Sequence, residues 1–300
     1  MQFKRIKKNV NGVLLLDKPL GFSSNQALQK VKWLYQAAKA GHTGTLDPLA
    51  TGLLPICLGE ATKFAQYVTD ADKTYFATIK LGATTTTGDA EGDVLTTMAV
   101  NVSKQQFEQA CAQFTGEISQ MPPMYSALKY EGKALYEYAR AGVEIERKSR
   151  LINISNIILE NFSVDIAQIT VVCSKGTYIR TLAEDIGAAL GCGAHLIGLR
   201  RTETAGYLFK NAVTIEQLEA MSSENRDALL MPVDSAIESL PVVTLNADAA
   251  FYIKQGQAVW QASKTPAGDL RLYDEQNQFL GLGHLQDDGK IAPKRLIKNI

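Results

Sequence analysis

One carboxylate stands out in the stretch GHTGTLDPLATG, which runs from Gly41 to Gly52. Asp47 is the only acidic residue in it and stands directly before Pro48. The glycines permit backbone conformations closed to other residues, and the proline favours an extended conformation at Asp47. The pattern therefore predicts an ordered loop that displays one carboxylate. Such an aspartate often only caps a turn, but ordered loops that display a polar group also concentrate function, and an ionised carboxylate is a competent nucleophile.

Two further segments carry candidate groups. Tyr75 lies in KTYFATIKLG, where alternating residues predict a strand, and an aromatic side chain packed on a sheet is its simplest interpretation. In KGTYIR, Gly176 breaks a strand, and Tyr178 and Arg180 follow at alternating spacing. An arginine there can pair with a buried carboxylate, favour its ionised form and fix its rotamer. We therefore expect Asp, Tyr and Arg to carry whatever chemistry the chain performs.

Metal and nucleotide chemistry have little support in the sequence. The chain has three histidines, and none has a second histidine or a cysteine at ligand spacing. Its four cysteines lie far apart, which indicates buried thiols rather than a disulfide framework. The segment GATTTTGDAEGD contains neither a Walker lysine nor a dinucleotide fingerprint. We therefore predict no metal and no cofactor.

The composition is that of an ordinary globular chain. Of the 300 residues, 46% are hydrophobic and 21% charged, with a formal net charge of zero, which speaks weakly against a protein that coats nucleic acid indiscriminately. Positive charge gathers locally in KRIKK, in Arg200-Arg201 and between Lys129 and Arg150, where tyrosines interleave with it. No stretch approaches the roughly 18 apolar residues of a membrane span. We expect no membrane contact and a cytoplasmic location.

The order of the predicted elements indicates an α+β fold, because strands and helices alternate without a regular βαβ rhythm. A buried strand over 13–16 delivers Asp17 and Lys18 to its exposed end, and a helix capped by Ser23 or Ser24 follows. Segment 120–150 contains two prolines and resembles an excursion from the core. Beyond Pro241, short strands with Gly punctuation predict a small β-barrel or sandwich. We place the domain boundary there, with domains at 1–240 and 241–300. The other predicted elements are strands at 53–59, 150–160 and 165–174 and helices at 60–70, 103–114, 134–141 and 181–190.

Six regions of the chain, in order, resemble the TruB family of tRNA pseudouridine synthases: VLLLDKPLGFSSNQAL, GHTGTLDPLATGLLPICLGEATKF, DKTYFATIKLG with TGDAEGD, PPMYSALKYEGKALYEYARAG, CSKGTYIRTLAEDIG and HLIGLRRTETAGYL. The tail, with FLGLG and IAPKRL, is similar to the PUA-type RNA-binding domain of bacterial members. The resemblance implies the pseudouridine synthase fold, a mixed and mostly antiparallel sheet flanked by helices, followed by a small PUA-like barrel.

The resemblance also implies an activity. The family isomerises uridine to pseudouridine at position 55 in the T-loop of elongator tRNAs, without a cofactor. Asp47 matches its essential aspartate, which either adds to the pyrimidine ring or attacks or electrostatically stabilises the sugar carbon. Tyr75 is similar to the tyrosine that stacks on the target base and can remove a proton from carbon, and Arg180 to the partner of the aspartate. His42 resembles the residue that enters the T-loop as the nucleotide flips out.

The remaining implied roles concern the pocket and the RNA. Tyr178 and Leu199 match pocket residues, and the excursion matches a mobile thumb that closes on RNA. The residues in segments that resemble RNA-contacting parts are Lys18, Lys63, Asp89, Lys129 and Arg140.

The family resemblance leaves alternatives open. One is a tRNA-folding chaperone, in which opening of the T-loop matters apart from catalysis. Others are a guide-RNA-dependent synthase and an RNA-binding module without catalysis. The intact thumb-like segment favours the stand-alone form, a monomer that binds the tRNA T-arm without an obligate protein partner.

Overall fold

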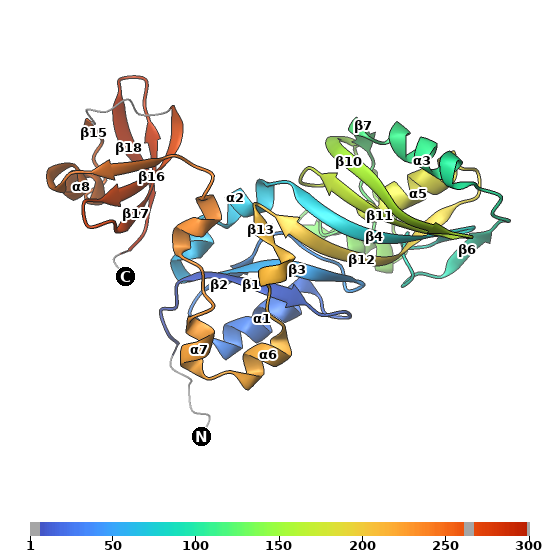
Figure 1. Ribbon diagram of the computed structural model, residues 1–300, viewed down its shortest axis with the longest axis horizontal. Helices are drawn as coiled ribbons and strands as arrows, with labels where there is room; N and C mark the ends of the chain where they lie inside the picture. The colour runs from blue at the N-terminus through green and yellow to red at the C-terminus, as the bar shows by residue number, and fades with distance from the viewer. Residues whose placement is uncertain (1–6, 261–266, 299–300) are drawn as a thin grey trace.

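The computed structural model describes residues 7–260 and 267–298, and a single large sheet organises the first part of the chain (Figure 1). Its strands follow the order β1-β3-β12-β4-β11-β10-β7, and β2 and β13 extend it by pairing with β3 and β12. Neighbours are antiparallel except β3 and β12, which run parallel. The strands span Gly12–Lys18 (β1), Ala40–His42 (β2), Ala50–Leu58 (β3), Lys73–Leu81 (β4), Gly116–Gln120 (β7), Arg150–Ser163 (β10), Ile166–Cys173 (β11), Ala194–Thr204 (β12) and Tyr207–Leu208 (β13).

Helices cover the sheet because its strands send apolar side chains to both faces. In β1, Leu14 and Leu16 pack into one core and Val13 and Leu15 into another. The first core contains α1 (Ser24–Leu34), α3 (Lys104–Gln113), α5 (Ile179–Ala189) and α6 (Ile215–Ala220). The second contains η1 (Gly59–Lys63), α2 (Ala65–Asp70) and η3 (Val233–Ile237). Two further short helices of this part are η2 (Phe209–Asn211) and α7 (Ser223–Asp227).

Local sequence signals explain where the helices begin and end. The Ser23 hydroxyl accepts from the Gln26 backbone N–H, and the Gln26 side chain accepts from the Ser23 N–H, which is a capping box at the start of α1. The same arrangement, with Ser103 and Gln106, begins α3. These two helices confirm the predicted ones within a residue. The predicted helix over 60–70 is wrong in part, because a 3₁₀ turn, η1, precedes a short α2.

Two excursions leave the sheet, one at the edge strand β7 and the other after the central strand β4. Segment 121–149 departs after β7 and returns at β10, whose first residue, Arg150, pairs with Gln120. It contains a hairpin of β8 (Lys129–Tyr130) and β9 (Lys133–Ala134), followed by α4 (Leu135–Arg140). The second excursion is a hairpin of β5 (Ala83–Thr85) and β6 (Val94–Thr97).

The C-terminal part forms a separate sheet, drawn in orange to red at one end of Figure 1. Its order is β14-β16-β17-β18-β15, with strands Val242–Leu245 (β14), Val259–Trp260 (β15), Gly268–Asp274 (β16), Phe279–Leu285 (β17) and Lys290–Leu296 (β18), and helix α8 spans Ala247–Lys254. The predicted fold class is confirmed: a mixed, mostly antiparallel sheet with helices, followed by a small curled sheet domain of the PUA-like kind.

Side chains join the two parts. Phe64 packs edge-on against Phe279, with ring centroids 5.7 Å apart, and the Tyr67 hydroxyl donates to Asp269 at 2.7 Å. Among the described residues, no helix is long and apolar enough to cross a membrane.

Candidate active site

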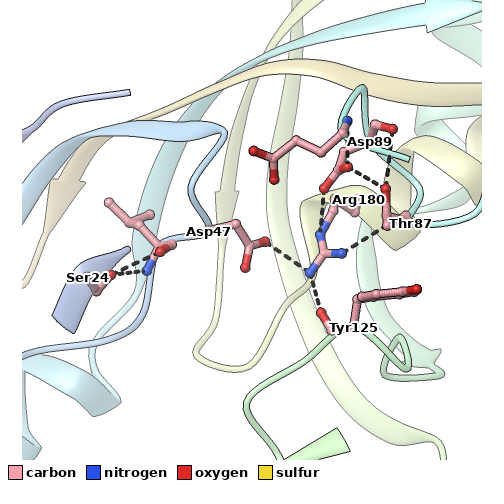
Figure 2. Close-up of polar contacts among 8 residues, drawn as sticks. Ser24, Asp47, Thr87, Asp89, Tyr125 and Arg180 are labelled. Carbon is pink, nitrogen blue, oxygen red and sulfur yellow. Dashed lines mark hydrogen bonds and ion pairs between the residues drawn. The ribbon is translucent and has the colours of Figure 1, made fainter. Parts of the chain in front are cut away.

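The loop between β2 and β3 carries Asp47, and hydrogen bonds from Ser24 hold the preceding residue, Leu46. The Ser24 hydroxyl donates to the Leu46 carbonyl at 3.0 Å and accepts from the Leu46 N–H at 2.7 Å (Figure 2). At the far end of the loop, Gly52 has a φ of +97°, and an added Cβ there would lie 2.4 Å from the Arg201 carbonyl oxygen. Only glycine allows this approach of β3 to β12. The loop is therefore anchored on both sides of the carboxylate.

Arg180 lies between two carboxylates from different loops (Figure 2). Its Nη2 is 3.0 Å from Asp47 Oδ2, and its Nε is 3.6 Å from Asp89 Oδ2. The side chains of Arg180 and Asp89 are 5% and 3% exposed, whereas that of Asp47 is 40% exposed. One carboxylate is thus enclosed, and the other is paired yet still open to an incoming molecule.

The guanidinium is also fixed by backbone carbonyls. It donates to Thr87 O at 2.9 Å and to Tyr125 O at 2.6 Å, the second from segment 121–149. Asp89 is itself held, because its Oδ1 accepts from the Thr87 hydroxyl at 2.5 Å and from the Glu91 N–H at 3.1 Å. Arg180 therefore joins the Asp47 loop, the loop of the β5–β6 hairpin and segment 121–149.

The position of Arg180 departs from the predicted helix boundary. The helix was expected to begin at Thr181, but α5 begins at Ile179, so Arg180 lies in its first turn. The Gln120 side chain donates to Tyr178 O at 3.1 Å and accepts from the Tyr178 N–H at 2.8 Å. This clamp fixes the backbone just before the helix, and the local sequence KGTYIR contains no sign of it.

Burial and charge set the electrostatics of Asp47. Burial raises the pKa of this carboxyl, and Asp89 adds to the rise, while Arg180 and Lys18 act in the opposite direction. Burial also lowers the pKa of Lys18 to about 8, although the nearby carboxylates act to raise it. Lys18 stands as a second cation near Asp47.

The expectation that Lys18 lies at an exposed strand end is wrong. Its side chain is fully buried, and its ammonium donates to the carbonyls of Pro19 and Phe22, so it holds the turn after β1. The reason is that bridges to Val213 and Met231 cover the outer edge of β1, and its last residue, Lys18, still pairs with Gly52. A buried ammonium bound to these carbonyls is not available to a phosphate.

Tyr75, Leu199 and His42 lie on three different strands of the sheet. Tyr75 is buried on β4, and Leu199, half-buried on β12, is paired with Ala77 of β4 and Ala50 of β3. Burial raises the pKa of Tyr75, and Arg201 works against that rise. His42 is half-buried at the end of β2, and its pKa is lowered by burial and by Arg201. His42 is therefore neutral at pH 7, and its Nδ1 has no hydrogen-bond partner among the described residues.

The remaining predicted residues are spread over the surface. Tyr178, half-buried, lies with its ring 5.8 Å from the Arg150 guanidinium. Lys129 and Arg140 are exposed on segment 121–149. Lys63 is different, because its ammonium binds Glu60 at 2.6 Å and the Leu296 carbonyl at 2.8 Å, which ties η1 to the C-terminal sheet.

Sequence reasoning missed several residues that build the site. Ser24 was expected only as a cap, yet it anchors Leu46, and Gln120 was not singled out. We expected Arg201 on a basic patch. This expectation is wrong, because β12 runs through the middle of the sheet and only 1% of Arg201 is exposed. A period-2 reading of β12 places Arg201 on the side of Leu199, and this signal was present in the sequence.

The arrangement suits acid–base and nucleophilic chemistry on a neutral ring or a sugar. It offers one open carboxylate, one arginine that can hold it ionised, and a buried phenol nearby. Among residues 7–260 and 267–298, no group of three or more His, Cys, Asp or Glu side chains is placed to hold a metal ion.

Comparisons with known proteins identify the class. A solved chain from a Cbf5–Nop10–Gar1 complex superimposes with a TM-score of 0.71 at 27% identity, covering 96% of this chain and 84% of that one. The description "TruB family pseudouridylate synthase (N terminal domain)" matches residues 32–179. The fold and these matches define an enzyme of the pseudouridine synthase class.

The full length of the chain then gives the family. It is 63% identical over 298 residues to tRNA pseudouridine synthase B of Methylobacillus flagellatus and 51% identical over 302 residues to that of Pseudomonas paraeruginosa, with 99% of each chain covered. Residues 180–238 match a tRNA pseudouridylate synthase B C-terminal domain, and 241–297 match the TruB C-terminal region. The chain belongs to the TruB family of pseudouridine synthases.

Proposed function

We propose that this tRNA pseudouridine synthase isomerises the uridine at position 55 in the T-loop of elongator tRNAs. The observation that carries the proposal is the open Asp47 carboxylate, paired with a buried Arg180 on a loop anchored at Leu46 and Gly52. A carboxylate in fixed geometry gains most from proximity, since a misplacement of about 1 Å costs on the order of a hundredfold in rate. The family relatives named for tRNA support the substrate class.

The residues suggest which side chain performs each step of the isomerisation. Asp47, ionised by Arg180, adds either to the pyrimidine ring or to the sugar carbon, so that the glycosidic bond to nitrogen breaks and a bond to carbon forms. Tyr75 stacks on the base and accepts the proton that leaves the ring carbon. His42, neutral at pH 7 by its lowered pKa, fills the place of the extruded nucleotide. Extrusion costs a few kcal/mol, which stacking and insertion offset.

RNA binding in this proposal relies on segment 121–149 rather than on the whole surface. Its exposed Lys129 and Arg140 lie near aromatic side chains, with Arg140 5.4 Å from the Tyr136 ring centroid. Phosphate contacts there supply affinity and position, while T-arm shape and the flipped base supply specificity. Lys18 and Lys63 do not belong to this set, because both ammonium groups donate to backbone carbonyls of the protein itself. Asp89 acts through Arg180 instead of touching RNA.

The deciding experiment is tritium release from carbon-5-labelled uridine in an unmodified tRNA transcript, with no guide RNA added. Wild type, Asp47→Asn and Asp93→Asn are compared, since Asp93 is an exposed carboxylate of the nearby polar loop. We expect release by wild type and Asp93→Asn but none by Asp47→Asn. Release that requires a guide RNA, or no release by a wild type that still binds the transcript, contradicts the proposal.

A tRNA-folding role stays a hypothesis beside this one, as does the cytoplasmic location. The Asp47→Asn variant separates the two activities, because it keeps the binding surface and loses only the carboxylate charge. If Asp47→Asn restores the fold of a misfolded transcript as fast as wild type does, the folding role is independent of isomerisation.

A further inference from the structure

Arg201 is the largest of the fully buried side chains among the described residues, with 1% of its surface exposed. On β12 it lies opposite Gly52 of β3 and opposite Tyr75 of β4. No carboxylate among the described residues lies within ion-pair distance of its guanidinium. Fully buried arginines are almost always paired, because an uncompensated buried charge costs several kcal/mol. The side chain therefore calls for an explanation beyond packing.

Its hydrogen bonds reach the loop that carries Asp47 and the strand that follows the loop. Nε donates to Leu53 O of β3 at 2.7 Å, and Nη2 donates to Gly44 O at the start of the loop at 3.4 Å. A Cβ added at Gly44 would lie 3.4 Å from Nη1, so the loop backbone passes close to the guanidinium. One buried group thus joins the start of the loop to β3.

Arg201 also lies beside Tyr75, because the two residues are paired across β12 and β4. Burial raises the pKa of Tyr75, and the positive charge of Arg201 opposes that change.

A second buried cation lies close by. Lys73 is 6% exposed, and its ammonium donates to the carbonyls of Val68, Thr69 and Ala71. Burial, and then the charge of Arg201, lower the pKa of Lys73 to about 8. The protein therefore tolerates repulsion between two buried cations beneath Tyr75, although an apolar residue at Arg201 would avoid it.

We infer that Arg201 is a positioning residue of the isomerisation: its buried guanidinium ties the start of the Asp47 loop to strand β3, which follows the loop, and so holds Asp47 in place. The inference rests on the proposed function and adds a residue to it. Arg180 contacts the Asp47 carboxylate directly, whereas Arg201 acts through the backbone carbonyls of Gly44 and Leu53.

The test compares Arg201→Lys with Arg271→Lys, a control on β16 whose Nε also donates to a backbone carbonyl, Leu240 O, at 3.0 Å. The Arg271 side chain is 16% exposed and pairs with Asp234 at 3.3 Å. Tritium release is measured in single turnover with saturating enzyme, together with transcript binding and melting temperature. We expect Arg201→Lys to bind the transcript as wild type does and to react at least about tenfold more slowly. Arg271→Lys should stay within about twofold of the wild-type rate, because its contacts lie outside the Asp47 loop.

A double-mutant cycle with Ser24→Ala distinguishes positioning from general stability, because Ser24 holds the same loop at Leu46. If both residues act by holding the Asp47 loop, the two substitutions together cost less than the product of their separate effects. Multiplicative effects, or a rate within about twofold of wild type for Arg201→Lys, overturn the inference.

Two outcomes need a second measurement. Should no Arg201 variant fold, Ser24→Ala in the otherwise unchanged chain decides, because it loosens the same loop and should slow the single-turnover rate at unchanged transcript affinity. A rate within about twofold of wild type overturns the inference. A wild type that releases no tritium refutes the proposed function instead, and the melting temperatures of the variants still report on the anchoring of the loop.

Discussion

Replacing Arg180 with methionine tests the site as a whole, since four contacts meet at this side chain. The substitution keeps much of the volume and removes the charge. It leaves Asp89, which is 3% exposed, without its cation, and leaves the carbonyls of Thr87 and Tyr125 without a donor. Removing one partner of a buried ion pair costs roughly 3–5 kcal/mol. We attribute that cost mainly to Asp89, because Asp47 is 40% exposed and water screens its charge.

That free energy converts to a change in melting temperature. A domain of this size loses about 2–4 °C per kcal/mol, so the transition of the catalytic part should fall by about 6–20 °C. Arg180→Lys, which keeps one charge but cannot span both carboxylates, should lie between this variant and wild type. Scanning calorimetry and single-turnover tritium release follow both variants, and the rate of Arg180→Met should drop at least about a hundredfold.

The pH dependence of the melting temperature of Arg180→Met tests the direction of this effect. Arg180 lowers the pKa of Asp47, so its removal raises that pKa further. A carboxyl whose pKa is raised in the folded state disfavours folding at pH values where it is ionised. The destabilisation of Arg180→Met should therefore be largest near neutral pH and shrink as the pH falls through the raised pKa. A melting temperature within about 2 °C of wild type, or a loss that grows in acid, would refute the reasoning about this charge cluster.

Three further predictions concern the loop. Because burial raises the pKa of Asp47, Asp47→Asn should melt at or above the wild-type temperature while losing tritium release, as calorimetry and the release assay will show. Ser24→Ala leaves both backbone groups of Leu46 without partners, so we expect a loss of about 1–3 kcal/mol in urea unfolding and a slower single-turnover rate at unchanged transcript affinity. Gly52→Ala would bring a Cβ within 2.4 Å of a backbone oxygen, whereas Gly41→Ala meets nothing within 4 Å. The first should express poorly as folded protein and the second should match wild type in soluble yield and melting temperature.

The sequence predicted what is encoded locally. Helices α1 and α3 begin at serine caps whose partners lie three residues ahead, and β4 alternates between buried and half-exposed positions along its whole length. The break between η1 and α2 was missed, as was the early start of α5. The second depends on Gln120, whose clamp on Tyr178 comes from 58 residues away. Such contacts leave no trace in a window of local sequence.

The site shows the same division between residue type and placement. Chemistry and family motifs pointed to Asp47 and Arg180, and the structure brings them within 3.0 Å. Whether a cation on a strand faces solvent or the core depends on which segments pack around that strand, and Lys18 and Arg201 were misplaced for that reason. The roles of Tyr75, His42, Lys129 and Arg140 stay predictions.

Charge distribution in the site explains why Asp47 has two cations near it, Arg180 and Lys18. Asp47 has to be open to a nucleotide and ionised, yet burial and Asp89 raise its pKa. Asp89 cannot simply be absent, because it accepts the Thr87 hydroxyl and the Glu91 N–H and so shapes the loop that also binds Arg180. Arg180 can serve both carboxylates only because its fork is planar and fixed by carbonyls, which a lysine could not reproduce. One of those carbonyls belongs to Tyr125, so any movement of segment 121–149 upon RNA binding changes the number of donors that Arg180 can direct to Asp47.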